Sequence, residues 1–144
     1  RDPELNMGRI LAIDYGNKRT GLAITDPLRI IATPLDTVRT HLLLQYLKEY
    51  FSREYVTEVV LGYPTQLDQS ETDVTRNVKS LELQLRGIFS DKAIHLHDER
   101  FTSKMALSAM ITGGMKKKER RIKGNIDRVS ATIILQSYLE SIEK

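Results

Sequence analysis

Residues 10–24 read ILAIDYGNKRTGLAI, and this stretch decides how the rest of the chain is interpreted. Two short apolar runs enclose a polar turn that contains glycine, a pattern typical of two strands joined as a hairpin. Asp14 comes directly after the first run, so a strand would deliver its carboxylate to the sheet. A solvated acid in a turn is the alternative interpretation of Asp14.

The composition indicates one globular domain. The 144 residues are 40% hydrophobic and 28% charged, which is ordinary for a globular protein and enough to bury a single core. The longest apolar run is far too short to span a bilayer, so we expect no membrane partner. The absence of cysteine excludes disulfides and thiolate metal sites, and it suits a cytoplasmic protein. Residues 1–6 lack any periodic pattern, so we expect a tag or disordered N-terminus there and a single domain over residues 7–144.

Hydrophobic periodicity predicts an α/β fold with a mixed five-stranded sheet. The expected strands cover residues 9–14, 20–25, 30–34, 58–63 and 93–97. The first three follow one another closely and should be antiparallel, whereas the last two flank a helix over residues 74–89 and should be parallel. Further helices are expected over residues 41–54, 102–112 and 126–142. Thr37 or Thr40 would open the first of these, and Asn125 would cap the last.

The formal charge of +3 is concentrated in one segment. Residues 115–128 contain seven bases against two acids, a local charge of +5, which leaves −2 for the rest of the chain. The bases are Lys116, Lys117, Lys118, Arg120, Arg121, Lys123 and Arg128. Such a concentration points to a polyanionic partner, although a solvated loop kept soluble by its lysines would have the same composition.

Three acids stand where this fold could bring them together. Asp14 ends the first strand, Glu99 follows the last strand, and Asp127 lies in the first turn of the last helix. Their carboxylates would repel one another without cations, so such a cluster suits Mg²⁺ or Mn²⁺. Two such ions can activate a water and stabilise the leaving oxygen of a phosphodiester displacement. Each acid also has a structural explanation, because Asp127 could interact with the helix dipole and Glu99 could pair with Arg100.

Two histidines, His95 and His97, alternate on the last expected strand in the manner of a zinc-binding pair. His41 is the only other histidine, and cysteine is absent. We therefore do not expect a zinc site.

Four segments form a specific pattern through their order and spacing. They are DYGNKRTGLA at residues 14–23, GYP at 62–64, DERFTS at 98–103, and the helix over residues 127–139. In these segments the chain resembles the YqgF (RuvX) proteins, and the resemblance covers nearly all of it after Met7. It implies a ribonuclease H-like fold related to the bacterial Holliday junction resolvases. One loop departs from the family pattern, because residues 67–70 read LDQS where the family usually has an Asp-Gly turn. The resemblance therefore does not define the turn geometry of this loop or any substrate contact that it makes.

The resemblance implies that Asp14, Glu99 and Asp127 are the catalytic, metal-binding acids of an endonuclease that uses Mg²⁺ or Mn²⁺. The substrates that it implies are the precursor of 16S ribosomal RNA, trimmed at its 5′ end, and by analogy four-way DNA junctions. Gly16 and Gly21 would permit a tight turn beside Asp14. The expected substrate-binding residues are Lys18, Arg19, Arg100, Lys116, Lys117, Lys118, Arg120 and Arg121.

These binding residues would act on the phosphate backbone rather than on the bases. Lys18 and Arg19 would hold a phosphate beside the acids, and residues 115–123 would follow the nucleic-acid backbone with strong salt dependence. Arg100 could contact the cleaved strand or anchor the acids by ion pairing. Because no base-reading motif is present, the sequence leaves RNA and DNA as alternatives.

Two other classes of protein share parts of this pattern. ATP-using kinases of the actin and sugar-kinase superfamily open with a similar strand, turn and strand, but they carry a second such turn that is absent here. A nucleic-acid binding module without catalysis, such as a ribosome assembly factor, would use the basic segment equally well. Both monomer and homodimer are compatible with the sequence, although symmetric cutting of a junction would require a dimer.

Overall fold

The structure, a computed structural model, describes residues 7–64, 73–99 and 123–142. Its strands are β1 (Arg9–Asp14), β2 (Arg19–Thr25), β3 (Ala32–Arg39), β4 (Val56–Pro64) and β5 (Ala93–Glu99). They form one sheet in the order β3-β2-β1-β4-β5. The pairs β1–β2 and β2–β3 are antiparallel, whereas β1–β4 and β4–β5 are parallel. This confirms the predicted mixed sheet of three antiparallel and two parallel strands.

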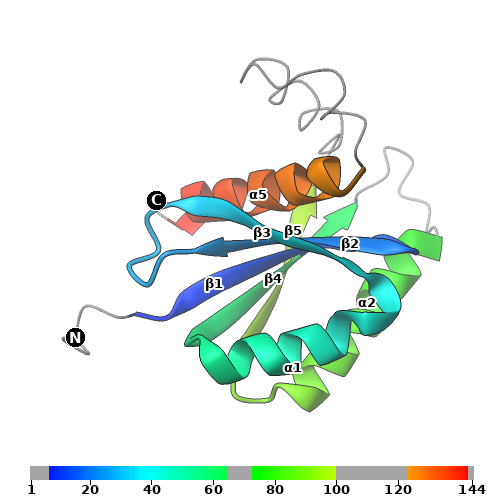
Figure 1. Ribbon diagram of the computed structural model, residues 1–144, viewed down its shortest axis with the longest axis horizontal. Helices are drawn as coiled ribbons and strands as arrows, with labels where there is room; N and C mark the ends of the chain where they lie inside the picture. Colours follow the sequence, from blue (N-terminus) through cyan, green and yellow to red (C-terminus); the bar gives the residue numbers. More distant parts are fainter. Residues whose placement is uncertain (1–6, 65–72, 100–122, 143–144) are drawn as a thin grey trace.

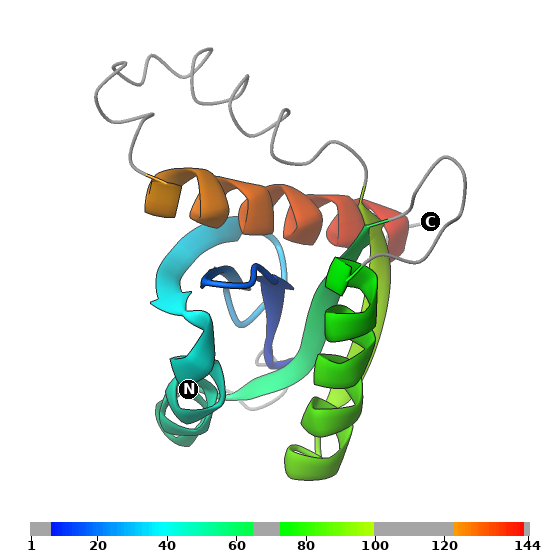
Figure 2. The ribbon, with the colours of Figure 1, turned by 90° about the vertical axis from the view of Figure 1, so that its right-hand side faces the viewer.

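Helices cover both faces of the sheet (Figures 1 and 2). One face carries α5 (Lys123–Ile142), and the other carries α1 (Leu43–Arg53), preceded by the short 3₁₀ helix η2 (Thr40–Leu42), and α2 (Asp73–Ile88). Strand alternation explains the two layers, because Leu11 and Ile13 pack with α1 and α2 while Ile10 and Ala12 pack with α5. None of the helices in the described ranges has both the length and the hydropathy to cross a membrane.

The third strand lies further along the chain than the sequence predicts. The prediction places it at residues 30–34, but β3 begins at Ala32 and includes Thr37. Asp26 accounts for the difference, because its carboxylate accepts hydrogen bonds from the backbone N–H groups of Ile30 and Ile31, both at 2.8 Å. Burial acts to raise the pKa of Asp26, but these backbone bonds together lower it. The N–H groups are thus used within the loop rather than in the sheet.

The last helix begins earlier than predicted. It starts at Lys123, so Asn125 lies inside the helix rather than at its N-cap. The preference of asparagine for the N-cap is only a weak local tendency and does not fix where a helix begins. The expected helix over residues 102–112 and the expected N-terminal tail lie outside the described residues.

A single carboxylate joins α5 to the sheet at the end remote from Asp14. Glu58 of β4 pairs with Arg29 at 2.5 Å, accepts a hydrogen bond from the Tyr138 hydroxyl at 2.9 Å, and lies 3.0 Å from Nε2 of His95. Burial of Tyr138, together with its bond to Glu58, raises the pKa of its phenol to about 12. The side chain of Glu58 is only 17% exposed, so these three partners replace most of its hydration.

We expect Glu58→Ala to lower the free energy of unfolding by about 1–3 kcal/mol, because it removes the common acceptor of three partly buried groups. The matched control is Glu54→Ala, which removes a 3.8 Å ion pair with Arg9 from a side chain that is 40% exposed. An exposed pair of this kind contributes about 0–1 kcal/mol. Urea unfolding of both variants measures the difference, and equal losses would contradict this role for Glu58.

Candidate active site

The hairpin of β1 and β2 places Asp14 on the face of the sheet that α5 covers. Asp14 is two residues beyond Ala12 and four beyond Ile10, both of which pack with α5. Since side chains alternate along a strand, Asp14 shares their face. It is half-buried and lies opposite Gly21 of β2 in the antiparallel ladder.

Gly21 allows the backbone of α5 to approach the hairpin at Asp127. A Cβ atom at position 21 would lie 2.0 Å from the backbone oxygen of Asp127 and 2.4 Å from its carbonyl carbon. Only glycine fits such an approach without displacing the helix. Because Gly21 is the cross-strand partner of Asp14, this contact brings the two predicted acids Asp14 and Asp127 to the same place.

The position of Asp127 in its helix corrects the sequence interpretation. Asp127 is the fifth residue of α5, and the first turn of the helix contains no acid. The influence of the helix dipole falls off within the first turn, so the expected placement in that turn, and the capping role that came with it, are wrong. Asp127 instead pairs with Arg19 of β2, whose Nε lies 3.5 Å from its Oδ2.

Thr40 forms two hydrogen bonds to the turn of residues 16–18, which contains Lys18 and leads into Arg19 of β2. Its backbone N–H donates to the Lys18 carbonyl at 2.9 Å, and its hydroxyl donates to the Gly16 carbonyl at 2.5 Å. The hydroxyl of Thr20 lies 2.9 Å from that of Thr40, and it is the donor here because the Thr40 proton is already used. Lys18 itself is exposed at the end of the molecule where Asp14 lies.

A hydrogen bond from α2 also holds this turn, because the Asn77 side chain donates to the Asn17 side chain at 3.2 Å. Neither Thr40 nor Asn77 is among the predicted site residues. Thr40 drew attention only as a helix opener, and Asn77 lies 60 residues from its partner. No short motif in the sequence signals such long-range contacts.

The third predicted acid, Glu99, is the last residue of β5 and lies opposite Pro64 at the end of β4. Since β1, β4 and β5 are parallel, the backbone of Glu99 ends its strand at the same edge of the sheet as Asp14. Among the side chains that the structure describes, which do not include that of Glu99, no three histidines or acids gather as a metal site. Arg100 and the basic residues Lys116, Lys117, Lys118, Arg120 and Arg121 also lie outside the described residues.

The two histidines of β5 contact α5. His95 stacks on Tyr138 with ring centroids 5.6 Å apart, and His97 meets the same ring edge-on at 5.7 Å. His97 also lies 2.9 Å from the Ser137 hydroxyl. Burial lowers the pKa of His97 while the charge of Asp98 opposes the shift, so this histidine is predominantly neutral at pH 7.

Comparison with known proteins identifies close relatives of the chain. A family model described as "RuvX: Holliday junction resolvase" matches residues 8–141. A proposed pre-16S rRNA nuclease of Phocaeicola vulgatus is 51% identical over 135 residues, which are 94% of this chain and 97% of that protein. One of the same name from Porphyromonas gingivalis is 49% identical over 138 residues, 96% of this chain and all of that protein.

Solved structures of Thermus thermophilus RuvC share the fold. RuvC in complex with a Holliday junction substrate aligns with a TM-score of 0.57 at 16% identity, and a second RuvC structure aligns with a TM-score of 0.52 at 14% identity. Each alignment covers 94% of this chain and 96% of the other. The predicted ribonuclease H-like fold is therefore confirmed.

Proposed function

This chain belongs to the RuvX family of Holliday junction resolvases, and from that premise we propose that it is a divalent-metal-dependent endonuclease that trims the 5′ end of the precursor of 16S ribosomal RNA. The relatives at 51% and 49% identity carry this substrate in their names. Membership of a nuclease family makes the chain an enzyme that acts on phosphodiester bonds of nucleic acid.

The observation that supports the site of this reaction is the contact of Gly21 with Asp127. It supports a site in which Asp127 of the last helix acts together with Asp14, at the edge of the sheet where β5 also ends. We propose Asp14, Glu99 and Asp127 as the catalytic acids. Interaction with the helix dipole does not account for Asp127, because Asp127 lies beyond the first turn of α5.

The described donors suit a hard cation, because Asp14 and Asp127 are half-buried carboxylates and Mg²⁺ prefers carboxylate oxygens. Asp14, Asp127 and Glu99 would hold Mg²⁺ or Mn²⁺, which when bound activates water and stabilises the leaving oxygen. Lys18 and Arg19 would hold a phosphate at the same edge. Arg19 thus has two roles in this proposal, as the partner of Asp127 and as a substrate contact.

A four-way DNA junction is the second candidate substrate. The description of the family and the shared fold with RuvC, solved with such a junction, favour it. Symmetric cutting of a junction would require a homodimer, whereas trimming of one RNA end needs a single copy. A third candidate function is that of a ribosome assembly factor, which would bind RNA without cutting it.

The decisive experiment offers precursor 16S RNA and a DNA junction to the same preparation, with Mg²⁺, with Mn²⁺ and with a chelator. We expect the RNA to be shortened at its 5′ end only when a divalent ion is present. Cutting of the junction alone would replace the proposed substrate by the second candidate. Binding without cleavage of either substrate would leave the assembly factor as the function.

The basic segment should determine the salt dependence of binding. Replacing Lys116, Lys117 and Lys118 together by glutamine should reduce the slope of log K against log salt by about 2–3, because each phosphate contact contributes about 0.7–0.9. Lys48→Gln on the exposed surface of α1 is the control and should leave the slope unchanged. A triple variant with the wild-type slope would place the phosphate contacts elsewhere.

A further inference from the structure

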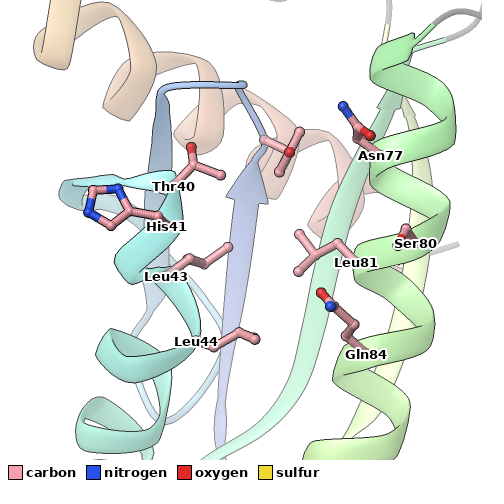
Figure 3. Close-up of a pocket in the computed structure, with 9 residues that line it drawn as sticks. Thr40, His41, Leu43, Leu44, Asn77, Ser80, Leu81 and Gln84 are labelled. Carbon is pink, nitrogen blue, oxygen red and sulfur yellow. The ribbon is translucent and has the colours of Figure 1, made fainter.

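A cavity of about 260 Å³ lies between α1 and α2, on the face of the sheet opposite α5. Figure 3 shows Leu43 and Leu81 pointing toward each other from the two helices, with Leu44 deeper along α1. Leu43 and Leu81 are buried, whereas Leu44 and Tyr15 of the same lining are partly exposed. An occupant would therefore rest an apolar surface on Leu44 and Tyr15.

Most polar side chains of the cavity are uncharged. Tyr15, Thr40, Asn77, Ser80 and Gln84 line it together with the imidazole of His41, and the described lining residues include no Asp, Glu, Lys or Arg. Carboxamides both donate and accept hydrogen bonds, so Asn77 and Gln84 offer the two kinds of contact that the edge of a nucleobase requires. A phosphate or a charged metabolite would find no carboxylate, ammonium or guanidinium group among these residues.

The cavity lies at the same end of the sheet as the candidate active site, but on the opposite face. Tyr15 directly follows Asp14, so their Cα atoms are about 3.8 Å apart. Thr40 and Asn77 line the cavity and also bond to the turn of residues 16–18. A strand whose phosphate lies beside Asp14 could thus pass round this end of the sheet and place a neighbouring base between the helices.

We propose that this cavity receives one unpaired base of the nucleic acid, next to the phosphodiester that is cleaved. The inference rests on the proposed nuclease function, which supplies the strand. The base lies against Leu44 and Tyr15, and its edge bonds to Asn77 and Gln84. The site therefore selects strands that are unpaired at this position, independently of the phosphate contacts.

The test places a single abasic nucleotide at successive positions around the cleavage point. At one position, kcat/KM for the wild type should fall by about 5- to 100-fold, the range expected when one stacked base is lost. Gln84→Glu should lower kcat/KM for the intact strand. For this variant, an abasic nucleotide at that position should cause no further loss of kcat/KM. Leu83→Glu adds the same charge to α2 at a side chain that is 70% exposed and not among those lining the cavity, so it should keep the wild-type pattern.

A second measurement separates this inference from the proposed function. A single strand carrying a photoreactive thiobase is crosslinked to the wild type without a divalent ion, and the modified residue is mapped by mass spectrometry. A crosslink at Tyr15, Asn77 or Gln84 supports the cavity even if no substrate is cleaved. Cleavage with no abasic position affected, or crosslinks only outside these residues, overturns the inference and leaves the nuclease function standing.

Discussion

Replacement of Asp14 by asparagine is expected to lower metal-dependent cleavage by at least about 100-fold, since loss even of groups that merely support a metal ligand costs about 10- to 100-fold. Asparagine has nearly the same shape as aspartate but lacks its charge. Binding of nucleic acid should be unchanged or tighter, because a negative charge is removed close to the phosphates. Cleavage rates and a binding titration on the same preparation measure both effects.

Asp91→Asn is the matched control for Asp14→Asn. Asp91 lies before β5, at the opposite end of the sheet, and its side chain is 75% exposed. The control removes the same charge and should leave cleavage intact. If the Asp14→Asn protein cleaves at the wild-type rate, Asp14 is not a catalytic acid, and the role proposed for this edge of the sheet is wrong.

Gly21→Ala should both destabilise the protein and abolish cleavage. The added methyl group would meet backbone atoms of α5 at 2.0 and 2.4 Å, and backbone cannot move aside as a flexible side chain can. We expect a loss of about 3 kcal/mol or more in the free energy of unfolding, at the upper end for overpacking. Displacement of α5 would also separate Asp127 from Asp14.

The same substitution at Gly87 provides the control, because nothing lies within 4 Å of a Cβ atom there. Gly87→Ala in α2 should stabilise the protein by about 0.5–1 kcal/mol, since alanine favours a helix more than glycine does. Denaturant unfolding and cleavage assays compare the two variants. Wild-type stability and activity in Gly21→Ala would show that the backbone of α5 lies further from Gly21 than this close approach requires.

Local periodicity was enough to predict β1, β2 and β4, because these strands are buried on both faces and their apolar residues are contiguous. It misplaced β3, which is partly exposed and whose start depends on Asp26 withdrawing backbone N–H groups from the ladder. It also misplaced the start of α5, which lies at Lys123 and leaves Asn125 inside the helix. The start of β3 depends on side-chain hydrogen bonds to the backbone within the loop, which hydrophobic periodicity does not register.

In the candidate site, local signals could be read from the sequence and long-range contacts could not. The position of Asp14 after an apolar strand is a local signal, and the sequence alone placed it at the end of β1. The interpretation of Gly21 as a turn residue was incomplete, because its main constraint is the backbone of a helix more than 100 residues away. The pairing of Arg19 with Asp127 depends on that same approach. Only the folded chain shows why these residue types occur together.

The aromatic contact at the far end of α5 gives this helix its own spectroscopic signal. The rings of His95 and His97 both lie within 6 Å of the Tyr138 ring, and the chain has only one other histidine, His41. Ring currents from Tyr138 should therefore shift two of the three imidazole resonances while α5 is seated on the sheet. The docking of the helix that carries Asp127 can thus be followed by NMR in a resting protein, with neither nucleic acid nor metal in the sample.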